Sequence, residues 1–357
     1  MTPDLKKFCL AGTALSFAFL AEPAMANSVT FEGSTFTSQG LVGVARVPSN
    51  ARDKYGETLG GIGSAMAVIP NSWKKNKDGS YSGILVGVPD RGWNTQGTLD
   101  FRGRTQRFKI RLTPFYGAQT NAQDQLQMDY KHLTALHYVR PTTGEDAIKV
   151  IQGYGNFPDM PAGGNGRLSV DNEGIAFQGD GTFWVSDEYG PYVYHYAASG
   201  KLLNVIRPPE AFIPRRLDSH GNPVENFSAN APGIGESYNL GNPVSGRQNN
   251  QGMEGLSISA DHTKLYVLLQ SALIQDTKVT DISHTRRNTR LLEYSITDTL
   301  HPQLIHEYAV QLPTYTNGTG NANLVAAQSE LHAINDHQFM VLARDSSVGE
   351  TFPATPD

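Results

Sequence analysis

The sequence predicts an all-β protein with a β-propeller-like fold, in which repeated four-stranded antiparallel blades surround a central channel. Three observations support this prediction: short runs rich in β-branched and aromatic residues, no long amphipathic helical pattern after residue 26, and an internal repeat. Of the 357 residues, 39% are hydrophobic, which is enough for a large core and excludes a disordered chain.

The expected strands are short and are bounded by turn residues. Asp78-Gly79 and Asp180-Gly181 predict hairpin turns, because glycine tolerates a positive φ. The runs that predict strands are residues 84–88, 107–112, 147–151, 183–186, 264–268 and 338–342.

A hairpin of two strands recurs along the chain. Its copies span residues 171–190, 252–271 and 329–345, and a fainter copy spans residues 60–92. Glu173, Glu254 and Glu330 align at the start of each first strand. The residues that align at the end of the second strand are Asp90, Glu188, Gln270 and Arg344. Repeated antiparallel hairpins favour a propeller over the alternative, a β-sandwich with insertions.

The intervals between the copies are long for single blades. The four residues at the ends of the second strands are 98, 82 and 74 residues apart, whereas one blade usually takes about 40–50 residues. Each interval therefore holds either two blades or one blade with a large loop.

Apolar and aromatic residues recur inside the second strands. Trp184, Tyr266 and Met340 align with one another, so we expect all three to lie in the core rather than to bind a sugar. His195 lies between Tyr194 and Tyr196 in an expected strand, which favours a packed histidine over a catalytic one.

Residues 1–26 have the pattern of a signal peptide. Lys6 and Lys7 precede an apolar run that is too short to span a bilayer, and Ala24 and Ala26 are the small residues of a cleavage site after Ala26. We expect residues 27–357 to form one domain with no membrane span, in the periplasm or secreted. Cys9, the only cysteine, lies in the signal, so the mature chain has no disulfide and no thiol nucleophile.

Charge and missing motifs exclude several functions. The chain has 29 Lys and Arg against 34 Asp and Glu, a net charge of −5, which argues against a nucleic-acid partner. It has no Gly-x-Ser-x-Gly elbow, no His-Glu-x-x-His zinc motif and no phosphate-binding Gly-x-x-x-x-Gly-Lys loop.

The repeated acidic residues are the candidate site, because equivalent points of successive blades meet at one mouth of the channel. Carboxylates that converge need a cation or an arginine, or one of them takes up a proton and can act as a general acid. The candidate calcium ligands are Asp90, Glu188 and Glu254. Arg91, Gln270 and Arg344 are candidates for binding an anionic substrate. The structural alternative is that the acidic residues cap the turns of the blades. Residues 247–250 either edge the channel or form a solvated loop.

Several ordered motifs resemble the phytase-like family, known for "esterase-like activity of phytase". They are residues 171–176, 184–188, 247–255, 269–273, 290–294 and 329–344, and the resemblance covers about residues 57–345. It implies an exported, propeller-like protein whose repeated acidic residues hydrolyse phosphoesters. The catalytic residues implied in this sequence are Glu173, Asp187, Glu188, Glu254 and Glu330.

The chain departs from the family pattern at two points. The first copy has Gly63-Ser64 where other copies have Glu-Gly, so its acidic residue is missing or is supplied by Asp90. Chains that resemble the family usually continue with further strands after the Arg344 motif, so we expect this domain to be incomplete at its C-terminus.

Three functional hypotheses follow. The first is a hydrolase of phosphoesters in which calcium neutralises the substrate phosphate and orients a water molecule, Glu188 or Glu173 handles the proton, and Arg344 stabilises the developing charge. The second is a calcium-dependent lactonase or carboxylesterase. The third is a propeller that binds a ligand or a protein without catalysis. No organic cofactor is expected.

Overall fold

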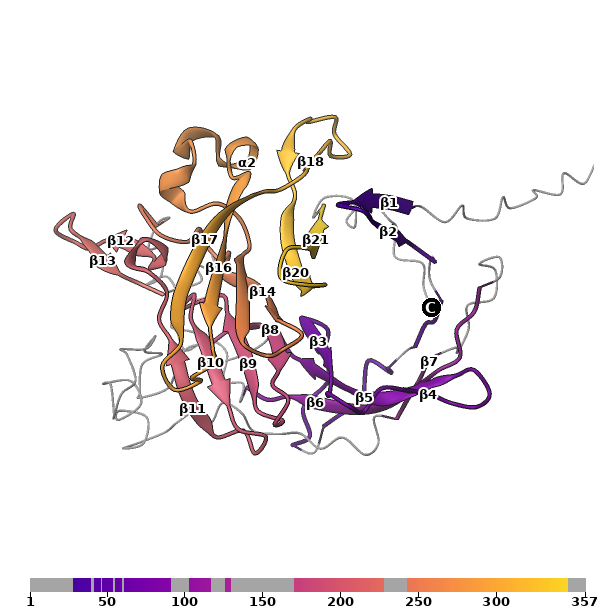
Figure 1. The fold of residues 1–357 in the computed structure, drawn as a ribbon. Helices are drawn as coiled ribbons and strands as arrows, with labels where there is room; N and C mark the ends of the chain where they lie inside the picture. The colour runs from indigo at the N-terminus through magenta and orange to yellow at the C-terminus, as the bar shows by residue number, and fades with distance from the viewer. Residues whose placement is uncertain are drawn as a thin grey trace, which may run out of the picture.

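The fold is mostly β and consists of several antiparallel sheets (Figure 1). The structure is a computed structural model that describes residues 28–39, 42–45, 47–53, 55–59, 61–90, 103–116, 126–129, 170–227 and 243–345. Within these residues the one α-helix is α2 (Ile282–Thr285), and three 3-10 turns lie at Glu210–Phe212, Ile274–Asp276 and Val279–Asp281. The predicted signal peptide and the expected strand at 147–151 lie outside the described residues.

Three sheets are built from successive antiparallel strands. In the first, β3 (Ala65–Val68), β5 (Tyr81–Val88), β6 (Gln106–Leu112) and β7 (Leu126–Asp129) follow one another, and β4 (Lys74–Lys75) pairs with β5. The second has β8 (Asn172–Phe177), β9 (Phe183–Asp187), β10 (Val193–Tyr196) and β11 (Leu202–Ile206). The third has β14 (Met253–Ile258), β15 (Lys264–Leu269), β16 (Asn288–Ser295) and β17 (Gln303–Gln311).

The remaining strands form two-stranded hairpins. β20 (Ala327–Ala333) pairs with β21 (Phe339–Arg344) and begins a fourth unit of the same kind. The other hairpins are β1 (Ser28–Phe31) with β2 (Ser34–Thr37), β12 (Arg215–Leu217) with β13 (Pro223–Glu225), and β18 (Thr314–Tyr315) with β19 (Leu324–Val325). In the residues that the structure describes, each of the two intervals from β8 to β14 and from β14 to β20 has one four-stranded sheet and one short hairpin.

The predicted strands agree with the structure in the part of the chain that it describes. The runs at 84–88, 107–112, 183–186 and 264–268 lie inside β5, β6, β9 and β15, and the run at 338–342 overlaps β21. The two predicted turns are also present, because Gly79 and Gly181 have φ of +83° and +87°.

The first strands of the units lie side by side, in the order β3, β8, β14, β20 (Figure 1). Two glycines permit this close approach. A Cβ atom on Gly174 would lie 2.5 Å from the Cβ of Leu256, and one on Gly255 would lie 2.7 Å from the Cβ of Leu331. The glycine of the Glu-Gly motif is therefore a packing requirement: a Cβ atom at either position would collide with the neighbouring first strand.

Strand pairing confirms one alignment of the repeat and corrects another. Ile175, Leu256 and Leu331 pair with Val185, Val267 and Val341, so Glu188, Gln270 and Arg344 are equivalent, each three residues further on. On the first strands, however, the residue equivalent to Glu173 and Glu254 is Ser329. The alignment of Glu330 with them was wrong by one residue. All three first strands carry a bulge at the same place, and counting back from the paired Ile175, Leu256 and Leu331 puts Glu330 level with Gly174 and Gly255.

Hydrogen bonds extend the equivalence to the first sheet. The N–H groups of Asp90, Glu188 and Gln270 donate to the carbonyls of Gly61, Asp171 and Gly252, at 3.0, 2.9 and 2.9 Å. The ends of the second strands are thus tied in the same way to the residues just before the first strands.

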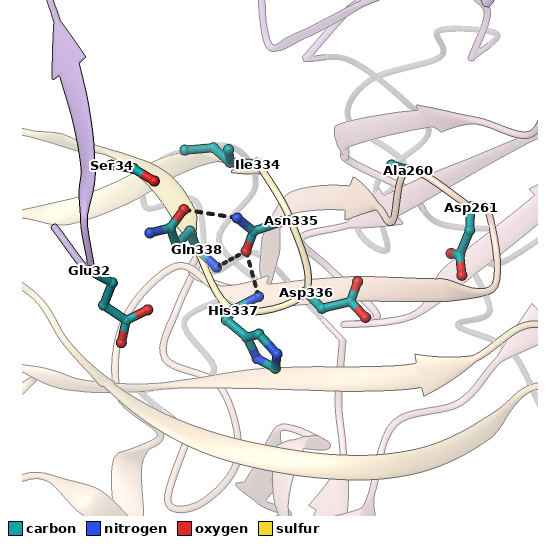
Figure 2. Close-up of a pocket in the computed structure, with 9 residues that line it drawn as sticks. All are labelled: Glu32, Ser34, Ala260, Asp261, Ile334, Asn335, Asp336, His337 and Gln338. Atoms are coloured by element: carbon teal, nitrogen blue, oxygen red, sulfur yellow. Dashed lines mark hydrogen bonds between the residues drawn. The ribbon is translucent and has the colours of Figure 1, made fainter.

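The β1–β2 hairpin lies against the turn between β20 and β21. The Gln338 amide donates to the carbonyl of Phe31 at 3.2 Å. Next to this contact is a pocket of about 540 Å³ (Figure 2). Its lining residues are Glu32, Ser34, Ala260, Asp261 and residues 334–338.

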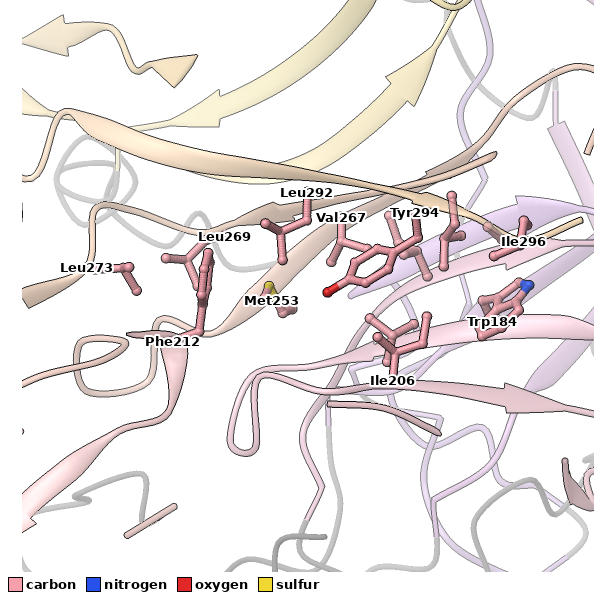
Figure 3. Packing of buried hydrophobic residues seen from close by; sticks show 14 residues of the cluster. Trp184, Ile206, Phe212, Met253, Val267, Leu269, Leu273, Leu292, Tyr294 and Ile296 are labelled. Atoms are coloured by element: carbon pink, nitrogen blue, oxygen red, sulfur yellow. The ribbon is translucent and has the colours of Figure 1, made fainter. Parts of the chain in front are cut away.

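The core fills the spaces between neighbouring sheets. Figure 3 shows the cluster between the second and third sheets, in which Trp184 and Ile206 face Val267, Leu292 and Tyr294. A second cluster joins the first sheet to the second and includes Val86, Val88, Ile175, Phe183 and Val185.

The predicted core positions agree with the structure in two of three copies. Trp184 and Tyr266 are fully buried, but the prediction for Met340 was wrong: this residue is 58% exposed. The reason is that β21, in the described residues, pairs only with β20 and lacks a neighbouring layer. His195 is buried and stacks on Trp184 with ring centroids 4.1 Å apart, which confirms a packed histidine.

Truncating the repeated core position should destabilise the fold in one copy and have almost no effect in another. We expect Trp184→Ala to lower the free energy of unfolding by about 3–5 kcal/mol, because it leaves a cavity in the core. Met340→Ala should change it by less than about 0.5 kcal/mol, since that side chain is exposed. Urea denaturation of both variants tests this. An equal loss in the two would mean that β21 is covered in solution.

Candidate active site

Carboxyl groups from four neighbouring units gather at one end of the first strands. They come from the start of the first strand or from the end of the second strand of each unit, because an antiparallel hairpin returns to the same end. The gathered residues are Asp90, Asp171, Glu173, Glu188, Glu254 and Glu330. Asp171 and Glu173 are each 6% exposed, Glu188 and Glu254 are also buried, and Asp90 is exposed.

The tightest group is formed by Asp90, Asp171 and Glu173. One carboxylate oxygen of each residue lies within 4.8 Å of the others. Hard oxygen ligands at such spacing suit a divalent cation such as calcium. Asp171 was missed as a site residue from the sequence. Its signal was its place at the head of the second repeat, two residues before Glu173.

Burial and mutual repulsion set the protonation of this group. Burial, followed by the charges of neighbouring carboxylates, raises the pKa of Asp171, Glu173 and Glu188 well above the ordinary range. Burial raises the pKa of Glu254 to about 8, although Arg344 opposes the shift, and burial raises that of Glu330 to about 7. Without a cation, part of the group must therefore hold protons at neutral pH, and a bound cation would displace them.

Asp187 has a different environment from the other predicted residues. Its carboxylate accepts the N–H groups of Asp171 and Tyr189, at 2.8 and 3.0 Å, and the hydroxyl of Tyr194 at 3.0 Å. Burial raises its pKa to about 6, while these donors favour its charged form. Asp187 thus joins the end of β9 to the start of β8, directly beside the cluster.

A second side of the cluster is built around Glu254. The Gln270 amide donates to Glu254 Oε1, and the Arg344 Nη2 atom lies 3.5 Å from the same oxygen. The Arg344 side chain is 53% exposed, so it can reach a bound molecule. Glu330 accepts the N–H of Leu331 at 2.9 Å and lies next to Glu254.

The first copy contributes a hydroxyl group in place of an acidic residue. Ser64 donates to Glu173 Oε2, across the boundary between the first and second sheets. Asp90 lies on the same side, as the alignment of the second strands predicted. Arg91, a predicted substrate-binding residue, lies outside the described residues.

Comparison with known proteins decides the family. The family described as phytase-like, "esterase-like activity of phytase", matches residues 81–355. The chain belongs to the phytase-like family. This confirms the resemblance found in the sequence motifs.

Individual relatives extend the comparison. An uncharacterized secreted protein of Arthroderma benhamiae is 44% identical over 339 residues, which are 88% of this chain. The chain spans 65% of that relative's length. Two crystal structures of virginiamycin B lyase from Staphylococcus aureus are similar to 78% of the chain. Their identities are 10% and 12%, their TM-scores 0.27 and 0.21, and 81% and 80% of those chains are covered.

None of the helices described here is long and apolar enough to cross a membrane.

The pocket of Figure 2 is separate from the acidic cluster. It is lined by the turns that connect β14 to β15 and β20 to β21, which are the opposite ends of those strands from Glu254 and Gln270.

The cluster predicts an unusual dependence of stability on pH. A carboxyl group with a raised folded-state pKa stabilises the fold below its ordinary pKa, and this stability is lost as the pH rises through the folded value. For Glu330 and Glu254 the loss extends to about pH 7 and 8. Burial lowers the pKa of His195 to about 4, so this residue changes the stability only at pH values below its ordinary pKa of 6.5. We therefore expect the metal-free protein to lose stability between pH 6.5 and 8.

Thermal unfolding at a series of pH values in chelator measures this trend. Glu254→Gln should flatten the decline, whereas the matched change at the exposed Glu307 should leave it unchanged. Stability that rises over the same interval would contradict the assignment of raised pKa values to this cluster.

Proposed function

We propose that this chain is an exported hydrolase of phosphoesters that uses the acidic cluster together with a bound calcium ion. The observation that carries the proposal is the group of Asp90, Asp171 and Glu173, two of them buried and all three within 4.8 Å through their carboxylate oxygens. Membership of the phytase-like family supports the same reaction class.

The proposed architecture is a propeller. The units that begin with β3, β8, β14 and β20 would be its blades, and the first strands would line its channel. Support comes from the side-by-side packing of these strands and from the four-stranded sheets that lead away from them. The acidic cluster would then lie at one mouth of the channel.

The residues present fit a calcium ion. Asp90, Asp171 and Glu173 offer only hard oxygen donors. In addition to burial, Glu254 lies close enough to raise the pKa of Glu173, and the charges of Glu173, Asp171 and Glu254 raise that of Glu188. When bound, such a cation would neutralise a substrate phosphate and lower the pKa of a water molecule. Its charge would also relieve the repulsion between the buried carboxylates.

The protein's own groups would divide the remaining work. Glu188, buried at the end of β9, or Glu173 would accept the proton of the attacking water. Arg344, exposed beside Glu254, would hold the phosphoryl oxygens by paired hydrogen bonds and stabilise the charge that develops on them. Gln270 would orient Glu254 through the bond to Oε1.

Export is proposed on two grounds. Residues 1–26 have the pattern of a cleaved signal peptide. The Arthroderma benhamiae relative is described as a secreted protein. The expected location is the periplasm or the medium.

A panel of substrates tests the activity. The purified chain, without residues 1–26, should hydrolyse a phosphomonoester or diester in calcium and lose this activity in chelator. Glu173→Gln and Glu188→Gln should each lower kcat at least about 100-fold, while Glu307→Gln, far from the cluster, should keep it. Folded protein without turnover on any substrate would overturn the proposal in favour of a binding protein.

A carboxylesterase or lactonase is the second candidate, since the family's description names an esterase-like activity. The same cation site could polarise a neutral carbonyl. The panel therefore includes a carboxylic ester and a lactone, and the preferred substrate chooses between the two reactions.

Arg344 offers an independent test of substrate charge. Arg344→Gln should raise KM for a phosphoester about tenfold or more and leave KM for a neutral ester unchanged, because only the anion uses the guanidinium. Arg111→Gln is the matched control, since this arginine is 50% exposed and pairs with Asp78 away from the cluster. Equal effects on both substrates would remove Arg344 from phosphate binding.

A further inference from the structure

Residues 246–252 form the segment that leads into β14. This segment contacts the backbone next to Glu188 and Gln270, two residues of the acidic cluster and its surroundings. The sequence left open whether residues 247–250 edge a channel or form a solvated loop. The first two of these residues are not solvated, because Arg247 is 0% exposed and Gln248 is buried, whereas Asn249 is half-buried and Asn250 is exposed. A fully buried guanidinium needs a specific reason, since arginine is almost never fully buried without partners.

The Arg247 side chain binds the backbone immediately after Glu188. Its Nε donates to the carbonyl of Tyr189 at 2.8 Å, its Nη1 to the carbonyl of Gln248 at 2.9 Å, and its Nη2 to that of Phe227 at 3.1 Å. One planar group thus joins the end of β9, its own segment and the connection after β13. Lysine cannot reproduce this geometry, because its ammonium lacks the rigid fork of donors.

Gln248 makes the corresponding contacts after Gln270. Its amide donates to Ser271 Oγ at 3.0 Å and to the carbonyl of Ala272 at 2.7 Å. Ser271 in turn donates to the side chain of Gln251. The two neighbours in sequence, Arg247 and Gln248, therefore hold the ends of β9 and β15, which belong to different sheets.

Gly252 completes this link. Its carbonyl accepts the Gln270 N–H at 2.9 Å, and a Cβ atom on it would lie only 2.0 Å from the carbonyl oxygen of Glu188. Glu188 and Gln270 are thus connected through one short segment, in which no side chain fits at position 252. Their side chains are the two that contribute to the cluster from the second strands of the second and third sheets.

Charge supports the same arrangement. Burial lowers the pKa of Arg247 to about 10, so the group stays protonated at neutral pH, and the carboxylates of Glu188, Asp187 and Asp171 favour this charged form. The buried positive charge in turn favours the ionised form of Glu188.

We infer that Arg247 is a positioning residue: with Gln248, it fixes Glu188 and Gln270 relative to each other at the acidic cluster. This inference rests on the proposed function, in which Glu188 handles a proton or binds the cation and Gln270 orients Glu254. The geometry requires no contact between Arg247 and the substrate.

Arg247→Lys in the full chain is the first test, with terbium(III) as a luminescent probe of the cation site. We expect binding of terbium to weaken about tenfold and kcat to fall about 100-fold, because a small displacement of a reacting group has a large effect on rate. KM should stay within about threefold, since substrate binding is assigned to Arg344.

Arg104→Lys is the matched control. Arg104 is equally buried and forms ion pairs with Asp53 and Glu57, neither of which belongs to the cluster. Its replacement should lower the melting temperature and leave kcat and the terbium affinity within about twofold. Gln248→Met, which keeps the Arg247 charge and removes only the contacts with Ser271 and Ala272, should lower kcat about tenfold.

Hydrogen exchange supplies a readout that needs no turnover. Amides of residues 187–190 and 270–272 should exchange faster in Arg247→Lys than in Arg104→Lys. A folded Arg247→Lys protein with wild-type kcat, terbium affinity and hydrogen exchange would overturn this inference and leave the proposed function intact. Equal loss of kcat in the Arg104→Lys control would also overturn it, by reducing the effect to stability. A wild-type protein that neither binds terbium nor hydrolyses any substrate would remove the proposed function and this inference with it.

Discussion

Contact between neighbouring first strands is the constraint on which the rest of the structure depends. Gly174 and Gly255 have no room for a Cβ atom, so β8 and β14 pack against their neighbours as closely as backbones allow. This packing brings the start of every first strand to the same place. The carboxyl groups next to these glycines must then share one small, buried volume.

Ionised carboxylates in that volume have a high electrostatic free energy unless their charges are neutralised. Buried carboxylates favour protons, and the presence of several close together strengthens this preference. Three hydrogen bonds to Asp187 reduce the cost of its charge, and Arg247 places one positive charge next to Glu188. For Asp90, Asp171 and Glu173 the corresponding neutralising charge is the proposed calcium ion.

The repeat makes an asymmetric site from equivalent positions. At the ends of the second strands the residues change in order from Asp90 and Glu188 to Gln270 and Arg344, so the charge passes from negative to positive across the cluster. Such a gradient suits a bound cation on one side and a phosphate on the other. Four equivalent hairpins therefore provide the scaffold, while their differences provide the chemistry.

The sequence by itself determined the strands, the hairpin turns, the repeat and most of the acidic cluster, because alternation, turn residues and equivalent positions are local patterns. It also determined the family. Only the tertiary structure decided the role of the Glu-Gly glycine, the one-residue offset of Glu330, the exposure of Met340 and the burial of Arg247. Each of these depends on which backbone lies opposite. A missing neighbouring strand, the register of a pairing or a carbonyl from a distant segment leaves no mark in the local sequence.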